Sequence, residues 1–151
     1  MRHVITALVQ NQPGVLAHVA GMFAARGYNI DSLVVGRTED PSLSRMTIVC
    51  IGDDRILEQV RKQLGKLIPV VKVRDFEETA FVERDLLLIR VHVAPEKRPE
   101  VIQVANLFRG RVVDVGRNSL MIELSGPEDK LEAFVDLLRP YGIQELARTG
   151  V

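Results

Sequence analysis

Two asparagines bracket the one stretch of this chain whose residues suggest ligand chemistry. Asn11 opens the turn Asn11-Gln12-Pro13-Gly14 between an apolar strand and a helix, and Asn29 follows Gly27, where that helix ends. A helix start presents unpaired backbone N–H groups that favour a carboxylate or phosphate. An asparagine side chain offers both a donor and an acceptor, which suits the ammonium and carboxylate of a free amino acid. We therefore interpret this stretch as a binding site and not a catalytic one.

The same asparagines also have a purely local explanation. Asparagine is common in turns, because its side chain hydrogen-bonds the nearby backbone and tolerates left-handed conformations. Both stand at turns, Asn11 beside Pro13 and Asn29 beside Gly27. From the residues alone, a ligand role and a turn role both stay open.

Catalytic and metal-binding chemistry has weaker support in the sequence. His3, His18 and His92 are far apart along the chain, and none has a second ligand at metal-binding spacing. The serines lack the context of a nucleophile elbow, and no glycine string resembles a phosphate-binding loop. The lone Cys50 lies in the apolar run MTIVCIG, where a buried strand explains it. We expect no catalytic residue and no metal site.

The composition limits the partners that this chain can have. Its 151 residues include 20 basic and 20 acidic ones, so it lacks the cationic excess that favours binding to a phosphate backbone. No apolar run is long enough for a membrane span, and the N-terminus lacks the features of a secretory signal. We expect a cytoplasmic protein that binds neither nucleic acid nor membrane.

The elements that must position the two asparagines follow from the spacing of apolar residues. Runs of β-branched residues predict strands, and apolar residues three and four apart predict helices. Pro13 suits the first turn of a helix, and Gly27 suits the residue after its end. Residues 1–75 are predicted to have the order β-α-β-β-α-β, with strands at 3–9, 30–37, 45–51 and 70–74, one helix from Val15 and one over 56–67.

The same order is predicted a second time after a linker. Residues 76–85 are acidic and lack a clear period, which is typical of a connecting segment. Two split βαβ units predict an α+β fold of two ferredoxin-like βαββαβ sandwiches, each with its helices on one face of the sheet. In the second domain, 86–151, strands are predicted at 86–93, 111–115, 120–124 and 143–148, with helices at 99–108 and 131–138.

One predicted edge strand indicates a homodimer. In this fold the first and third strands take the centre of the sheet, so the second strand of the first domain lies at an edge. Its residues 30–36, IDSLVVG, carry one charge and no proline, which makes this edge hazardous to leave unpaired in water. We expect it to pair with its copy in another chain.

RNA binding is the main alternative that the fold itself suggests. The RNA recognition module has the same βαββαβ order, and its central strands carry aromatic residues on which bases stack. The corresponding strands here, MTIVCIG and LMIELSG, carry no aromatic residue. With a neutral net charge as well, the sequence disfavours RNA binding.

The residues NQPGVLAHVAGMFAARGYNIDSLVVG, followed by EDPSLSRMTIV, resemble the small regulatory subunit of acetolactate synthase (acetohydroxyacid synthase). The resemblance continues through RILEQVRKQLGKLIPVVKV, ERDLLLIRV and LFRGRVVDV, so it covers nearly the whole chain. It implies an ACT domain for residues 1–75 and a second ferredoxin-like domain after it. Pro13 departs from the family pattern, in which a small polar residue is common, and should stiffen the loop.

The resemblance also implies a function. Such subunits have no catalytic activity of their own; they bind and activate the large, thiamine-diphosphate-dependent subunit of a transferase, and confer feedback inhibition by valine in branched-chain amino acid biosynthesis. Thiamine diphosphate, Mg and FAD are then expected in the catalytic subunit only. By the same resemblance the effector loop comprises Asn11, Gly14, Val15 and Leu16, and the segment contributed across the ACT dimer comprises Asn29 and Ile30.

A free-standing ACT-domain sensor of amino acids is the alternative function. Such a protein would control another enzyme or a transcription factor. A stable association with a large thiamine-diphosphate enzyme is expected only of the regulatory subunit, so co-purification distinguishes the two.

Overall fold

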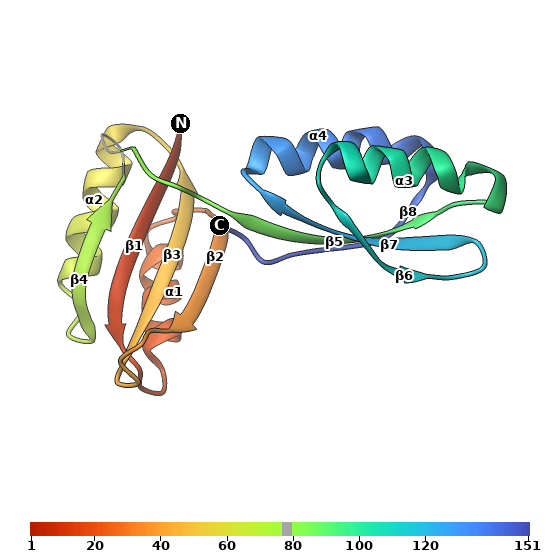
Figure 1. Ribbon diagram of the computed structural model, residues 1–151. Helices are drawn as coiled ribbons and strands as arrows, with labels where there is room; N and C mark the ends of the chain where they lie inside the picture. Colours follow the sequence, from red (N-terminus) through yellow and green to blue (C-terminus); the bar gives the residue numbers. More distant parts are fainter. Residues whose placement is uncertain (77–79) are drawn as a thin grey trace. The chain divides into compact units, whose positions relative to one another are not determined.

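The computed structural model describes residues 1–76 and 80–151 and divides into two compact units, Met1–Phe81 and Val82–Val151. The predicted linker, 76–85, spans this boundary, and its residues 77–79 lie outside the described part. Each unit is a four-stranded antiparallel sheet with two helices on one face (Figure 1). The predicted α+β class with two βαββαβ sandwiches is therefore confirmed.

The first unit has the strand order β2-β3-β1-β4, so its second strand lies at an edge of the sheet, as predicted. Strands β1 and β3 take the centre and pair over nine positions, from Arg2 opposite Ile51 to Gln10 opposite Leu43. The elements are β1 (Arg2–Gln10), α1 (Val15–Ala25), β2 (Ile30–Arg37), β3 (Leu43–Ile51), α2 (Asp54–Gly65) and β4 (Val70–Asp75).

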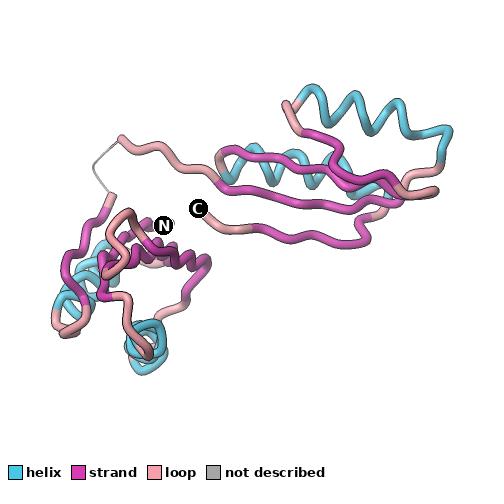
Figure 2. Tube along the Cα trace, turned by 60° about the horizontal axis from the view of Figure 1, so that its bottom comes forward, coloured by secondary structure: helices cyan, strands magenta, loops and turns pink. Residues whose placement is uncertain are grey.

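The core of the first unit lies between its sheet and its two helices (Figures 1 and 2). Ile5, Ala7 and Val9 of β1 are buried there, together with Val19 and Phe23 of α1. Successive side chains of a strand point to opposite faces. The even-numbered residues of β1 therefore lie on the side away from the helices, which is called the outer face below.

The ends of α2 show why its boundaries differ from those predicted. Asp53 caps its start, because the carboxylate accepts a hydrogen bond from the backbone N–H of Ile56 at 2.9 Å. The helix ends at Gly65, and Leu67, predicted to be helical, lies in the turn that follows. Leu67 still packs against the core, which explains its place in the apolar pattern.

The second unit repeats the topology with the strand order β6-β7-β5-β8. Its core is drawn from residues of this unit alone, among them Ile89, Val101, Ile122 and Phe134. Short 3-10 turns precede α3 and follow α4, at Pro95–Lys97 and Arg139–Tyr141. The elements are β5 (Asp85–His92), α3 (Arg98–Leu107), β6 (Arg111–Val115), β7 (Ser119–Gly126), α4 (Glu128–Leu138) and β8 (Ile143–Arg148).

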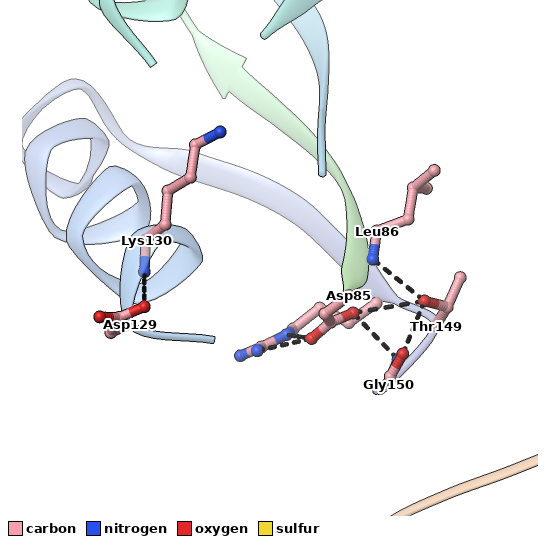
Figure 3. A network of polar contacts seen from close by, with 7 residues as sticks. Asp85, Leu86, Asp129, Lys130, Thr149 and Gly150 are labelled. Carbon is pink, nitrogen blue, oxygen red and sulfur yellow. Dashed lines mark hydrogen bonds and ion pairs between the residues drawn. The ribbon is translucent and has the colours of Figure 1, made fainter. Parts of the chain in front are cut away.

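A buried carboxylate joins the first and last strands of the second unit (Figure 3). Asp85, which the acidic composition assigned to the linker, is instead the first residue of β5 and only 3% exposed. Arg148 donates to its Oδ2 from Nε at 2.8 Å and lies 2.7 Å from it through Nη2. The backbone N–H of Gly150 and the hydroxyl of Thr149 donate to Oδ1 at 3.0 and 3.3 Å. Paired charge and hydrogen bonds together allow this carboxylate to be buried.

None of the helices in the described ranges has the length and apolar character needed to cross a bilayer.

Candidate effector site

Asn11 stands at the end of β1 and is tied to the turn before β3. Its backbone N–H donates to the carbonyl of Ser42 at 2.8 Å, and its side-chain Nδ2 donates to the carbonyl of Pro41 at 3.1 Å. The residue is exposed. Because the amide nitrogen is held by Pro41, Asn11 can present its Oδ1 as an acceptor to a ligand.

The turn that holds Asn11 is itself fixed by two hydrogen bonds to the Asp40 carboxylate. The Asp40 carboxylate accepts hydrogen bonds from the Ser42 hydroxyl at 2.7 Å and from the Ser42 backbone N–H at 3.0 Å. These two bonds lower the pKa of Asp40 below its ordinary value, the hydroxyl having the larger effect. The carboxylate is therefore charged at neutral pH. The two hydrogen bonds to the charged carboxylate weaken only as the pH falls through the lowered pKa.

The start of α1 leaves its first backbone donors without a side-chain cap. The N-cap residue is Gly14, in the left-handed conformation with φ 84°, and no side chain caps the helix there. The first bond along the helix runs from the N–H of His18 to the carbonyl of Gly14. The donors of Val15, Leu16 and Ala17 thus remain for a carboxylate.

The two aliphatic residues that follow Gly14 have different surroundings. The side chain of Val15 is buried in the core of the first unit, so only its backbone N–H is available at the turn. Leu16 is 46% exposed and lies next to those unpaired donors in the sequence. Leu16 therefore offers the apolar surface at this end of α1.

Asn29 is set at the other end of α1 by a left-handed helix cap. Gly27 has φ 69°, its N–H donates to the carbonyl of Ala24, and the N–H of Tyr28 donates to that of Phe23. This pair of bonds is the Schellman motif, and the Phe23 and Tyr28 rings meet edge to face at 6.2 Å. The expected glycine cap is confirmed, and it delivers an exposed Asn29 directly to β2.

The two asparagines lie at opposite ends of the same sheet. Ile30 pairs with Cys50, and Cys50 pairs with His3 near the start of β1, whereas Asn11 follows Gln10 at the end of β1. Gln10 lies seven positions after His3, which corresponds to about 23 Å along an extended strand. In Figure 1 the start of β2 and the end of β1 lie at opposite ends of the sheet. One chain therefore cannot bring both asparagines to a single amino acid.

Ile30 belongs with Asn29 at the start of the edge strand. It is half-buried and packs against the core of the first unit. The six site residues predicted from the sequence thus fall into two groups. Asn11, Gly14, Val15 and Leu16 lie where β1 passes into α1, and Asn29 and Ile30 lie where α1 passes into β2.

The other residues that could bind a metal or react, His3 and Cys50 among them, have structural roles. Within the described ranges, no three His, Cys, Asp or Glu side chains are grouped to hold a metal ion. His3 is buried, and its Nε2 lies 3.0 Å from the carbonyl of Gly52. Cys50 is buried in the core, and burial raises the pKa of its thiol, so it stays protonated at neutral pH. Both behave as core residues.

Sequence reasoning missed the role of the turn at residues 38–42. The residues Glu39-Asp40-Pro41-Ser42 have the composition of a polar turn, which predicts no contact with a distant residue. In the structure, the carbonyls of Pro41 and Ser42 accept both hydrogen bonds from Asn11. Pro41 lies 30 positions after Asn11 in the sequence. The Asp-Pro-Ser pattern signals a turn, but not its partner.

Comparison with known proteins connects this geometry with one family. Residues 5–72 match the family model described as the AHAS small subunit-like ACT domain, and residues 84–151 match the model for the small subunit of acetolactate synthase. The probable acetolactate synthase small subunit of Archaeoglobus fulgidus is 60% identical, over 99% of this chain and 94% of the relative. That of Aquifex aeolicus is 49% identical, over 99% of this chain and 78% of the relative.

A solved structure agrees over the same length. The crystal structure of the acetolactate synthase small subunit from Thermotoga maritima superposes with a TM-score of 0.92 at 43% identity, covering 99% of this chain and 94% of that one. The first unit is thus an ACT domain. This chain belongs to the family of acetolactate synthase small subunits, the regulatory and non-catalytic partners of that enzyme.

Proposed function

We propose that this chain activates the thiamine-diphosphate-dependent catalytic subunit of acetolactate synthase and makes it sensitive to valine, which binds between two paired ACT domains. Thiamine diphosphate, Mg and FAD belong to the catalytic subunit in this proposal. The observation that carries it is the position of Asn11 and Asn29 at opposite ends of a sheet whose free edge is β2.

Antiparallel pairing of β2 with its copy would bring Asn29 of one chain close to Asn11 of the other, so that the two chains share a site. A two-fold axis brings the start of one β2 to the end of the other. Asn29 of one chain then lies beside the 38–42 turn of the second chain, and that turn holds Asn11. A dimer built in this way has two equivalent sites, each made by both chains.

The chemistry of the two groups suits an aliphatic amino acid. The unpaired N–H groups after Gly14 receive the carboxylate, because a helix start favours negative charge. The Oδ1 of Asn11 accepts a hydrogen bond from the ammonium. Leu16 of one chain and Ile30 of the other supply apolar surface for the branched side chain.

Inhibition requires only that valine favours one arrangement of the dimer. If the attached catalytic subunit is less active in that arrangement, the difference in valine affinity between the two arrangements sets the strength of inhibition. By the same linkage, binding of the catalytic subunit changes the affinity for valine.

Calorimetric titration with valine tests the site. We expect saturable binding by the unmutated protein, and at least about tenfold weaker binding by Asn11→Ala and by Asn29→Ala, because each removes polar partners of a desolvated ligand. Exposed Gln103→Ala on α3 of the second unit is the matched control and should bind as the unmutated protein does. No binding by the unmutated protein, or full binding by both asparagine variants, refutes the site.

Activation is tested separately. Purified catalytic subunit should form acetolactate faster when this chain is added, and valine should reverse the increase. The two proteins should also co-purify as a stable complex. An unchanged rate and no complex would instead support a free-standing sensor.

A further inference from the structure

The outer face of the ACT sheet carries unneutralised positive charge at its centre. In β1, Leu8 lies on this face, and its partners across the strands are Arg45 of β3 and Lys72 of β4. Directly paired residues of antiparallel strands project to the same face. Arg74 lies two residues beyond Lys72, opposite Thr6, and so shares that face. All three cations are exposed.

The four strands, all of which lie in the described range, contain two acidic residues, and neither lies beside Leu8. Asp31 stands in the bulge at the start of β2, next to the partner of Val49 and four residues along β3 from Arg45. The acidic residue of β4, Asp75, faces the helices instead, where it pairs with Arg61 of α2 at 3.1 Å. The Arg74 guanidinium lies over the Phe76 ring, 5.0 Å from its centroid, which does not cancel its charge. The other outer-face residues that the strand register assigns are Arg2, Val4, Thr6, Leu8, Gln10, Ser32, Val34, Gly36, Leu43, Thr47, Val49 and Ile51, and the bulges add the exposed Asp31 and Val71.

The second unit provides an internal comparison, because it has the same fold and the corresponding face. There Arg90 of β5 pairs with Asp114 of β6 at 3.3 Å and lies opposite Glu145 of β8. Arg111 of β6 lies opposite Glu123 of β7. Arg90 and Arg111 of the second sheet thus face carboxylates, whereas Arg45, Lys72 and Arg74 of the ACT sheet have uncharged residues opposite them. The fold itself therefore does not explain why the cations of the first sheet lack carboxylates opposite them.

The three cations are close enough to act on one partner together. Arg45 and Lys72 flank Leu8 across two strand spacings, or about 10 Å, and Lys72 and Arg74 are about 7 Å apart along the strand. These separations are comparable to the Debye length of about 8 Å at physiological salt. Cations at this spacing repel one another, so carboxylates that a partner places between them lower the electrostatic energy.

We infer that the outer face of the ACT sheet, centred on Arg45, Lys72 and Arg74, docks an acidic surface of the catalytic subunit. The inference rests on the proposed function. Pairing through β2 extends the sheet edge to edge and does not itself cover this face, so each dimer carries the three cations twice. A balanced total of 20 basic and 20 acidic residues favours such a local protein contact over a nucleic acid.

Titration of the catalytic subunit with this chain, read out as acetolactate formation, tests the docking face. The double reversal Arg45→Glu/Lys72→Glu should raise the concentration for half-maximal activation about tenfold or more. Higher salt should raise that concentration for the unmutated chain and change it less for the double variant. The matched control is Arg55→Glu/Lys66→Glu, exposed cations of α2 and its C-cap on the helical side, which should leave activation unchanged.

Valine titration of the same variants separates docking from folding and from the effector site. Both double variants should bind valine within about twofold of the unmutated protein, since neither change touches the two asparagine groups. Equal activation by the outer-face variant and the unmutated chain overturns the docking face. So does RNA binding that the outer-face reversal abolishes while activation is kept. Failure of the unmutated chain itself to activate the enzyme refutes the proposed function and, with it, this inference.

Discussion

The buried carboxylate of Asp85 contributes to the stability of the second unit. Its carboxylate is 3% exposed and receives Arg148, Thr149 and Gly150, which fastens the end of the chain to the start of β5. Asp85→Ala leaves the Arg148 guanidinium and the Gly150 N–H without this acceptor. We expect the free energy of unfolding of the second unit to fall by about 2–4 kcal/mol, measured by urea unfolding followed by circular dichroism.

An exposed ion pair in the same unit is the control for this prediction. Arg139 and Asp136 lie 3.0 Å apart, but their side chains are 67% and 72% exposed. Asp136→Ala should therefore change the stability by no more than about 0.5 kcal/mol. Equal effects of the two substitutions would contradict a special role for Asp85.

The candidate site was predictable from the sequence at the level of residue type. Asn11 and Gly14 stand out because a polar side chain and a glycine meet at a helix start. The hydrogen bond from Asn11 to Pro41 was not predictable, because it joins residues 30 positions apart across the turn before β3. Val15 was predicted both at the apolar start of the helix and as an effector residue, and it is buried in the core. Its apolar character fits either role.

At the scale of elements, the proposed site depends on the edge strand β2, because pairing through this edge would complete it. Val34 lies on its outer face, opposite Thr47, and is half-buried. In a Val34→Lys variant the long side chain can reach solvent in one chain, but two copies repel each other across a paired edge. We expect weaker dimerisation by sedimentation velocity, and loss of valine binding in parallel.

A lysine elsewhere on the surface should have neither effect. Leu137 of α4 is 51% exposed, so Leu137→Lys adds the same charge without touching β2. A Val34→Lys protein that stays dimeric and binds valine normally would rule out pairing through this edge.

The order of elements was predictable, while several boundaries were not. Alternating and helical apolar spacing identified the eight strands and four main helices found in residues 1–76 and 80–151, because each buries one face against a core. The start of β5 was missed because an acidic residue normally signals a loop, and Asp85 is buried only through its contacts with residues 148–150. Such long-range compensation leaves no local pattern.

At the scale of the whole molecule, the chain has two separate cores. Phe23 is buried in the first core and Phe134 in the second, and the two clusters share no residue. Each substitution Phe23→Ala and Phe134→Ala should destabilise its own unit by about 3–5 kcal/mol. Hydrogen exchange resolved by mass spectrometry should show faster exchange in the unit that carries the change. Equal loss of protection in both units would indicate one cooperative fold instead.

In the proposed dimer, the opposite placement of Asn11 and Asn29 predicts complementation between variants. When an Asn11→Ala chain pairs with an Asn29→Ala chain, one site of the hybrid receives both defects and the other receives none. Two variants that each bind valine weakly should therefore complement each other after their subunits are exchanged, and calorimetry should recover wild-type affinity at a fraction of the sites. A site contained within one chain could not be restored by mixing.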